Sequence, residues 1–89
     1  MRLIVCAIYD RKVDGFGTQN LMMYPNDDIA KRAIHAAVLD ASMEYLRYAA
    51  DFSLWHVADF DSDNGVAVGI ERRKVCEFDA FVTAEAKEA

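Results

Sequence analysis

The clearest alternation of apolar and polar residues lies in the second half of the chain, over residues 51–70. Its β-branched and aromatic residues are typical of strands, and the turn-forming segment 62–65, Ser-Asp-Asn-Gly, divides it. A three-residue loop ending on Gly65, which adopts the left-handed backbone without a Cβ penalty, sets Phe60 opposite Val68. The pattern predicts a hairpin with one apolar face, interrupted only by His56 and formed by Leu54, Ala58, Phe60, Val66, Val68 and Ile70.

The register of this hairpin decides which side chains share a face. A two-residue type I′ loop would instead place Phe60 opposite Gly69, which is a poorer match. Because a slip of one residue sends the whole set to the other side, the three-residue loop is favoured. Trp55 and Val57 then fall on the opposite face, which indicates that this face is more than a plain solvent-exposed surface.

The first quarter of the chain predicts two strands joined by a loop. Residues 3–9 are a continuous apolar run, which fits a central strand buried on both faces. Residues 11–20 hold two glycines and several polar residues, so they are predicted to form a loop, in which Phe16 is either an exposed aromatic or an anchor packed on the core. Residues 21–24 predict a short strand that Pro25 ends.

A long helix is predicted from Asp27 to about Ala50, because Asn26 supplies a cap, acids fill the first turn, and no Gly or Pro interrupts the pattern. At helical spacing its apolar residues form two stripes rather than one. The first contains Ala30, Ile34, Ala37, Val38, Ala41, Tyr45 and Tyr48, and the second contains Ala36, Leu39, Met43, Leu46 and Ala50.

The second stripe needs a partner, because a single helix on a sheet buries only one. Either the C-terminal segment or a second copy of the chain can cover it. A chain this short has little left to do so, which favours a homo-oligomer with Leu39, Met43 and Leu46 at its interface.

These elements predict a single α+β domain over residues 1–89, an antiparallel sheet of three to five strands with one long helix packed on it. Residues 75–82 carry enough apolar side chains for a further strand or a packed extension. The small charged tail, about residues 84–89, is expected to fray.

Composition and charge narrow the class of protein. The hydrophobic fraction of 54% and the aromatic fraction of 11% exclude a disordered chain. The net charge of −5 argues against a broad basic surface for nucleic acid. No apolar run approaches the roughly 18 residues of a membrane span, and no cleavage site follows the first apolar run. We therefore expect a cytosolic protein without membrane contact, in which Cys6 and Cys76 are free thiols.

Neither candidate metal-binding motif has the residues and spacing that its metal requires. Asp59, Asp61 and Asp63 suggest a calcium loop, but counting from Asp59 places Gly65 at position 7 and Glu71 at position 13, one beyond the EF-hand positions. The two histidines are too few and too far from cysteine for a four-ligand zinc site. No catalytic residue, metal or cofactor is predicted, and the chain is not expected to be an enzyme.

One group of residues suggests contact with nucleic acid. The basic run 72–74 and the basic pair 11–12 are candidates for phosphate contacts. Trp55, Phe16 and Tyr9 are candidates for stacking on bases, which is how single strands are held without sequence preference. From the residues alone, a solvated strand end with edge-protecting charges is favoured over this interpretation. The candidate DNA-binding residues are Arg11, Lys12, Trp55, Arg72, Arg73 and Lys74.

Several short blocks, taken in order, resemble the small nonstructural protein of gokushovirus-type microviruses, which are phages with circular single-stranded DNA. The strongest block is the segment 51–61, DFSLWHVADFD, followed by Gly65. The others are Tyr9-Asp10-Arg11-Lys12, Ala30-Lys31-Arg32-Ala33-Ile34 and Val38-Leu39-Asp40. The family commonly has an aromatic where Ile34 stands, Asn-Asp where Leu39-Asp40 stands and Gly where Ala58 stands.

The resemblance implies a role and no reaction. It implies a DNA-binding protein of the host bacterial cytoplasm that acts when the phage changes from double-strand replication to single-strand synthesis and packaging. The partners it suggests are single-stranded DNA and the phage replication or procapsid proteins. The net negative charge favours an alternative function, an oligomeric adaptor that binds a viral or host protein without contacting DNA.

Overall fold

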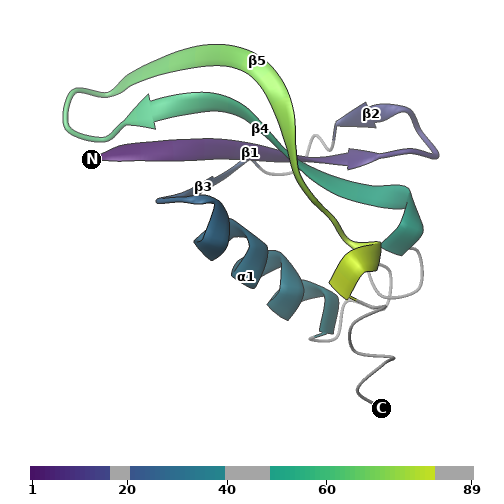
Figure 1. Ribbon diagram of the computed structural model, residues 1–89. Helices are drawn as coiled ribbons and strands as arrows, with labels where there is room; N and C mark the ends of the chain where they lie inside the picture. Colours follow the sequence, from purple (N-terminus) through teal and green to yellow (C-terminus); the bar gives the residue numbers. More distant parts are fainter. Residues whose placement is uncertain (17–20, 40–48, 82–89) are drawn as a thin grey trace.

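The computed structural model describes residues 1–16, 21–39 and 49–81. In this part of the chain a five-stranded antiparallel sheet has the order β2-β1-β4-β5, and β3 also pairs with β1 (Figure 1). The predicted antiparallel α+β arrangement is confirmed. The elements are β1 (Arg2–Asp10), β2 (Gly15–Phe16), β3 (Met22–Tyr24), α1 (Asp27–Leu39), the 3-10 turn η1 (Ala49–Asp51), β4 (Phe52–Asp61) and β5 (Val66–Glu77).

The first strand, β1, is central, as its continuous apolar run predicts. It pairs with β4 along its whole length and, on its other edge, with β3 near Cys6 and with β2 at its end. The consecutive residues Val5, Cys6 and Ala7 are all buried. Because neighbouring strand residues point to opposite faces, this burial covers both sides of β1.

The hairpin of β4 and β5 forms with a four-residue turn, so the predicted three-residue register is wrong. Phe60 lies opposite Ala67, and Ala58 lies opposite Gly69. Gly65 has the expected left-handed backbone, with φ of 74°. Side-chain hydrogen bonds stabilise this turn: the backbone N of Asp63 donates to Asp61 Oδ1 at 2.9 Å, and that of Val66 to Asn64 Oδ1 at 3.0 Å.

The changed register divides the predicted apolar face. Val66 and Val68 share a face with Asp61 and Asp59, their partners in β4, and the valine side chains are 51% and 57% exposed. Phe60 therefore lies on the opposite side of the sheet from both valines.

The last strand, β5, is longer than predicted. It continues through the basic run and ends at Glu77, so the two expected strands are one. Figure 1 shows β5 arching over the sheet and bending toward the end of α1. Phe78 then enters the core with no exposed surface, and its ring lies 5.7 Å from that of Phe52.

The helix α1 begins as predicted but is not long. The Asn26 side chain accepts a hydrogen bond from the backbone N of Ile29 at 2.9 Å, which caps the helix. The described helix ends at Leu39 after 13 residues, residues 40–48 lie outside the described part, and Ala49–Asp51 form the 3-10 turn η1. Tertiary contacts hold this turn, which leads into β4, because Ala49 is buried in the core.

The first predicted stripe of the helix is the buried one. Ala30, Ile34 and Val38 are at most 3% exposed and pack in the core with Cys6, Phe52, Leu54 and Phe78. On the second stripe, Ala36 is exposed. The predicted interface residues Met43 and Leu46, and the side chain of Leu39, lie outside the described residues. Within the described part, no helix has the length and apolar character needed to cross a membrane.

Candidate nucleic-acid interface

The basic run of β5 is divided between the two faces of the sheet. Trp55 of β4 lies opposite Lys74, and the next residue, His56, lies opposite Arg73. Because opposed residues share a face and neighbours alternate, Arg72 and Lys74 lie on the Trp55 side. Arg73 lies on the side that α1 covers.

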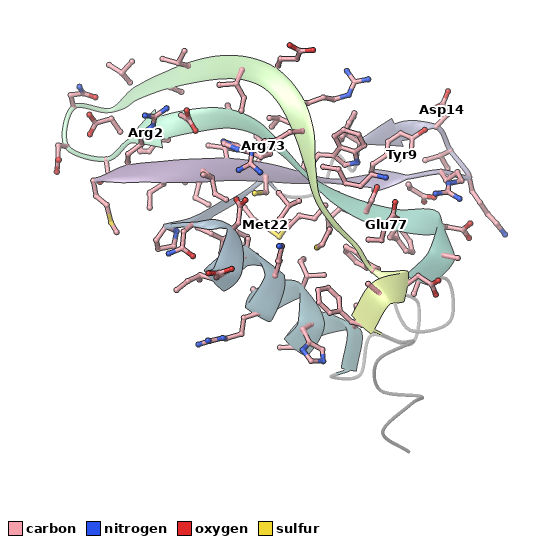
Figure 2. All side chains as sticks on the ribbon, viewed as in Figure 1. Arg2, Tyr9, Asp14, Met22, Arg73 and Glu77 are labelled. Atoms are coloured by element: carbon pink, nitrogen blue, oxygen red, sulfur yellow. The ribbon has the colours of Figure 1, made fainter. Side chains whose placement is uncertain are left out.

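Arg73, labelled in Figure 2, forms a bidentate ion pair with Asp27 in the first turn of α1. Its two terminal nitrogens donate to the two carboxylate oxygens at 2.8 and 2.9 Å. These hydrogen bonds hold the pKa of Asp27 below its usual value. Arg73 thus joins the helix to the sheet, and the structure does not place it with the other predicted DNA-binding residues.

Three aromatic side chains gather on the open face of the sheet, opposite α1. The two-residue strand β2 pairs Phe16 with Tyr9, and their rings lie 5.2 Å apart. Phe16 also meets Trp55 edge to face, with ring centres 6.1 Å apart and planes at 85°. The indole N–H of Trp55 donates to the Ser53 hydroxyl at 2.9 Å, which fixes the orientation of the ring. Phe16 is therefore a half-buried member of a cluster.

Two cations lie over this cluster. The Arg72 guanidinium carbon is 5.7 Å from the centre of the Phe16 ring and 5.8 Å from that of Trp55, and Lys74 Nζ is 5.6 Å from Trp55. These distances fit cation–π attraction. Lys74 also pairs with Glu77 at 2.6 Å, whereas Arg72 forms no ion pair within the described chain.

The cluster lines an open pocket of about 410 Å³, to which the β1–β2 hairpin, β4 and β5 contribute. Its lining consists of Tyr9, Asp14, Gly15, Phe16, Trp55 and Arg72. Figure 2 shows Tyr9 and Asp14 together at this hairpin, where the Tyr9 hydroxyl donates to Asp14 Oδ1. This hydrogen bond raises the pKa of Tyr9. Asp14 has a left-handed backbone, with φ of 51°.

The remaining predicted cations lie beside the pocket and not in it. Arg11 and Lys12 form the turn between β1 and β2, where the Arg11 N–H donates to the Asp51 carbonyl at 2.8 Å. Lys12 Nζ lies 4.0 Å from the Asp51 carboxylate. The structure therefore brings Trp55, Arg72 and Lys74 together and leaves Arg11 and Lys12 at the rim.

Asp14 is the pocket residue that the sequence interpretation missed. The segment 11–20 is predicted as a loop without strands, yet Asp14-Gly15 is a dipeptide typical of hairpin turns. With Tyr9 before it and Phe16 after it, this dipeptide was the available signal for a β1–β2 hairpin.

A second polar group lies on the covered side of the sheet. Buried His56 contacts Asp59 Oδ1 through Nε2 at 2.7 Å, and Arg2 donates to the same carboxylate. These hydrogen bonds, that from Arg2 first, hold the pKa of Asp59 below its usual value. Cys6 and Cys76 are free thiols, and burial raises the pKa of each to about 11, so they are not reactive thiolates at neutral pH.

Comparison with protein families now adds to this geometry. The family model described as Phage ORF5 protein matches residues 3–81. The chain belongs to the Phage ORF5 protein family. The match makes this a bacteriophage protein. No match was found among curated proteins or among solved structures.

The matched range of this ORF5-family protein contains every residue that lines the pocket. The pocket offers aromatic surface, one guanidinium and one carboxylate. Such a set can hold a flat, polar ring by stacking and hydrogen bonds.

Proposed function

We propose that this ORF5-family protein is a noncatalytic phage protein that binds single-stranded DNA during genome synthesis and packaging. The observation that carries the proposal is the pocket on the open face, where Arg72 lies over the rings of Phe16 and Trp55. Single-strand binding proteins combine aromatic surfaces for the bases with cations for the backbone.

The place of this role in infection rests on the resemblance to the gokushovirus nonstructural protein. In this proposal the protein acts in the host bacterial cytoplasm, alongside the phage replication or procapsid proteins. In this proposal the protein is a homo-oligomer, so that several pockets engage one strand together. Linked sites exceed the affinity of a single site without any new contact.

Charge limits the strength of one site. The chain carries a net charge of −5, and Arg73 is occupied by Asp27. Arg72 and Lys74, the latter by giving up its pair with Glu77, therefore supply at most about two phosphate contacts per chain. For single strands two contacts correspond to a salt slope of about −1.4.

The test is a titration of a labelled single-stranded oligonucleotide at about 50 mM and about 200 mM salt, with light scattering in the same buffers. We expect binding that weakens with salt, by a species larger than one chain. A duplex of the same sequence is the control, and we expect it to bind less, because its bases are not free to stack. Absence of binding at the lower salt concentration would contradict the proposal.

A protein-binding adaptor is the second candidate, and one observation favours it. Val66 and Val68 expose apolar surface beside the turn of the β4–β5 hairpin. Exposed apolar surface of this kind suits a protein partner better than a phosphate backbone. If the oligonucleotide does not bind, the variant Val68→Asp tests the adaptor. Loss of binding to a phage protein in this variant would support the adaptor.

A further inference from the structure

The polar groups of the pocket are chemically opposite. Asp14 presents a carboxylate, which accepts hydrogen bonds only, and Arg72 presents a guanidinium, which donates only. Both line the same pocket as the rings of Phe16 and Trp55. A ligand that satisfies both must be flat and must carry donors on one edge and acceptors on another.

Both groups are held in place without consuming their capacity. The Tyr9 hydroxyl donates to one oxygen of Asp14, and two carboxylate oxygens offer about four acceptor sites. Arg72 is positioned over two rings, and within the described residues it forms no ion pair, with Asp14 or any other acid. Its fork of donors remains available to a ligand.

Among the DNA bases, guanine matches this pair best. Its N1–H and N2–H₂ are adjacent donors that a carboxylate accepts side by side, and its O6 and N7 are adjacent acceptors that arginine contacts in a bidentate way. Adenine and cytosine offer a carboxylate only one amino group, and thymine offers only one imino group.

Resting on the proposed function, we infer that the pocket selects a guanine base, from a single strand or from a free guanine nucleotide. The base stacks on the aromatic cluster, Asp14 accepts from N1–H and N2–H₂, and Arg72 donates to O6 and N7. When a guanine is bound, Arg72 therefore contacts the base in place of a phosphate. The volume of about 410 Å³ lies at the lower end of the ~300–1,000 Å³ of small-ligand pockets, which suits one base and not a stack of several.

The test uses thymine oligonucleotides with one interior guanine, inosine, 7-deazaguanine or thymine. We expect the guanine strand to bind more tightly than the thymine strand by roughly 5- to 150-fold, the range for one good bidentate pair. Inosine lacks the N2 amino group and 7-deazaguanine lacks N7, so each should lose part of this advantage.

The matched variant is Asp14→Asn. Asparagine tolerates the left-handed backbone at this position, so the hairpin is retained. One of the two acceptor oxygens becomes an NH₂ donor, so the side chain can no longer accept N1–H and N2–H₂ side by side. We expect equal binding of the guanine and inosine strands and an unchanged thermal midpoint. The thymine strand should not lose affinity, because it makes no paired contact with Asp14 and the variant removes a negative charge. Arg72→Lys keeps the charge but not the fork, and should remove the difference between guanine and 7-deazaguanine.

The outcomes separate the inference from the proposed function. Equal binding of all four strands, or a guanine preference that survives Asp14→Asn, would overturn the guanine pocket and leave single-strand binding intact. Absence of binding to every strand would overturn both. If dGMP competes with the guanine strand more strongly than dTMP does, the site takes a free nucleotide. If guanine is preferred only within the oligonucleotide, the site takes DNA. Either result supports guanine recognition.

Discussion

The two faces of the sheet use adjacent residues for different purposes. On the face that α1 covers, Leu54 is fully buried and Arg73 is paired with Asp27. On the open face, the next residue, Trp55, is half-exposed, and Arg72 lies above its ring. Strand alternation therefore separates the buried core from the proposed DNA-binding face by a single position along the chain.

This difference changes how the basic run is interpreted. As a sequence, Arg72, Arg73 and Lys74 are three equivalent cations. In the structure Arg73 holds the helix, whereas Arg72 and Lys74 face the aromatic cluster. Replacing all three residues together would mix loss of the α1 ion pair with loss of the proposed DNA contacts.

The largest effect on stability is expected for Leu54→Ala. Leu54 has no exposed surface and packs in the core with Val38 and Phe78. The substitution should lower the free energy of unfolding by about 2–5 kcal/mol through lost burial and a cavity. Urea denaturation measures this change, and a loss below about 1 kcal/mol would show that the covered face is not the main core.

The next prediction concerns Trp55→Ala on the other face. Removing the ring should weaken single-strand binding by about 1–3 kcal/mol, the usual contribution of one stacking residue. The change in unfolding free energy should be smaller than that of Leu54→Ala, because Trp55 is only half-buried. Titration and urea denaturation of both variants give the comparison. Unaltered DNA affinity in the folded variant would remove the open face from the proposal.

Separate replacement of the neighbouring arginines sharpens the comparison. On a strand without guanine, where Arg72 contacts a phosphate, Arg72→Ala should weaken DNA binding and reduce the magnitude of the salt slope by about one, with little change in stability. Arg73→Ala should keep the salt slope and lower the unfolding free energy by at most about 1 kcal/mol, since its ion pair is partly exposed. Salt titrations and urea curves measure both. The reverse assignment of effects would mean that the register of β5 differs from the one described.

The smallest effect is a pH dependence on the covered face. Asp27 and Asp59 have lowered pKa values in the folded state, chiefly through hydrogen bonds from Arg73 and Arg2, respectively. Their contribution to stability is therefore present above the unfolded pKa of about 3.9 and is lost as the pH falls through the lower folded values.

Urea midpoints at neutral pH and at about pH 3 test this linkage. Asp27→Asn should lower the midpoint at neutral pH and reduce the loss on acidification. Asp28→Asn is the matched control, because Asp28 is the exposed neighbour of Asp27 in the same helical turn, and it should keep the acid loss. An acid loss that Asp27→Asn leaves unchanged would show that the Arg73 pair does not contribute to it.

Local patterns were enough to predict the parts of the fold that local chemistry decides. The apolar run of β1 predicts a central strand, Asn26 predicts the start of α1, and Gly65 predicts a left-handed turn residue. Each of these depends on side chains within a few positions. The predicted end of the helix, at about Ala50, is wrong because Ala49 lies in a 3-10 turn that tertiary contacts hold in the core. Helix propensity reflects the local segment only and cannot report such contacts.

By itself, the sequence of this protein determined the sheet class, the central strand, the helix start and the candidates Trp55 and Arg72. Only the tertiary structure decided the β4–β5 register, the ion pair of Arg73 with α1 and the presence of Asp14 and Trp55 in one pocket. The physical reason is the distance along the chain over which each effect acts. Propensity and periodicity act over a few residues, whereas the pocket exists only because β1 pairs with β2 on one edge and with β4 on the other.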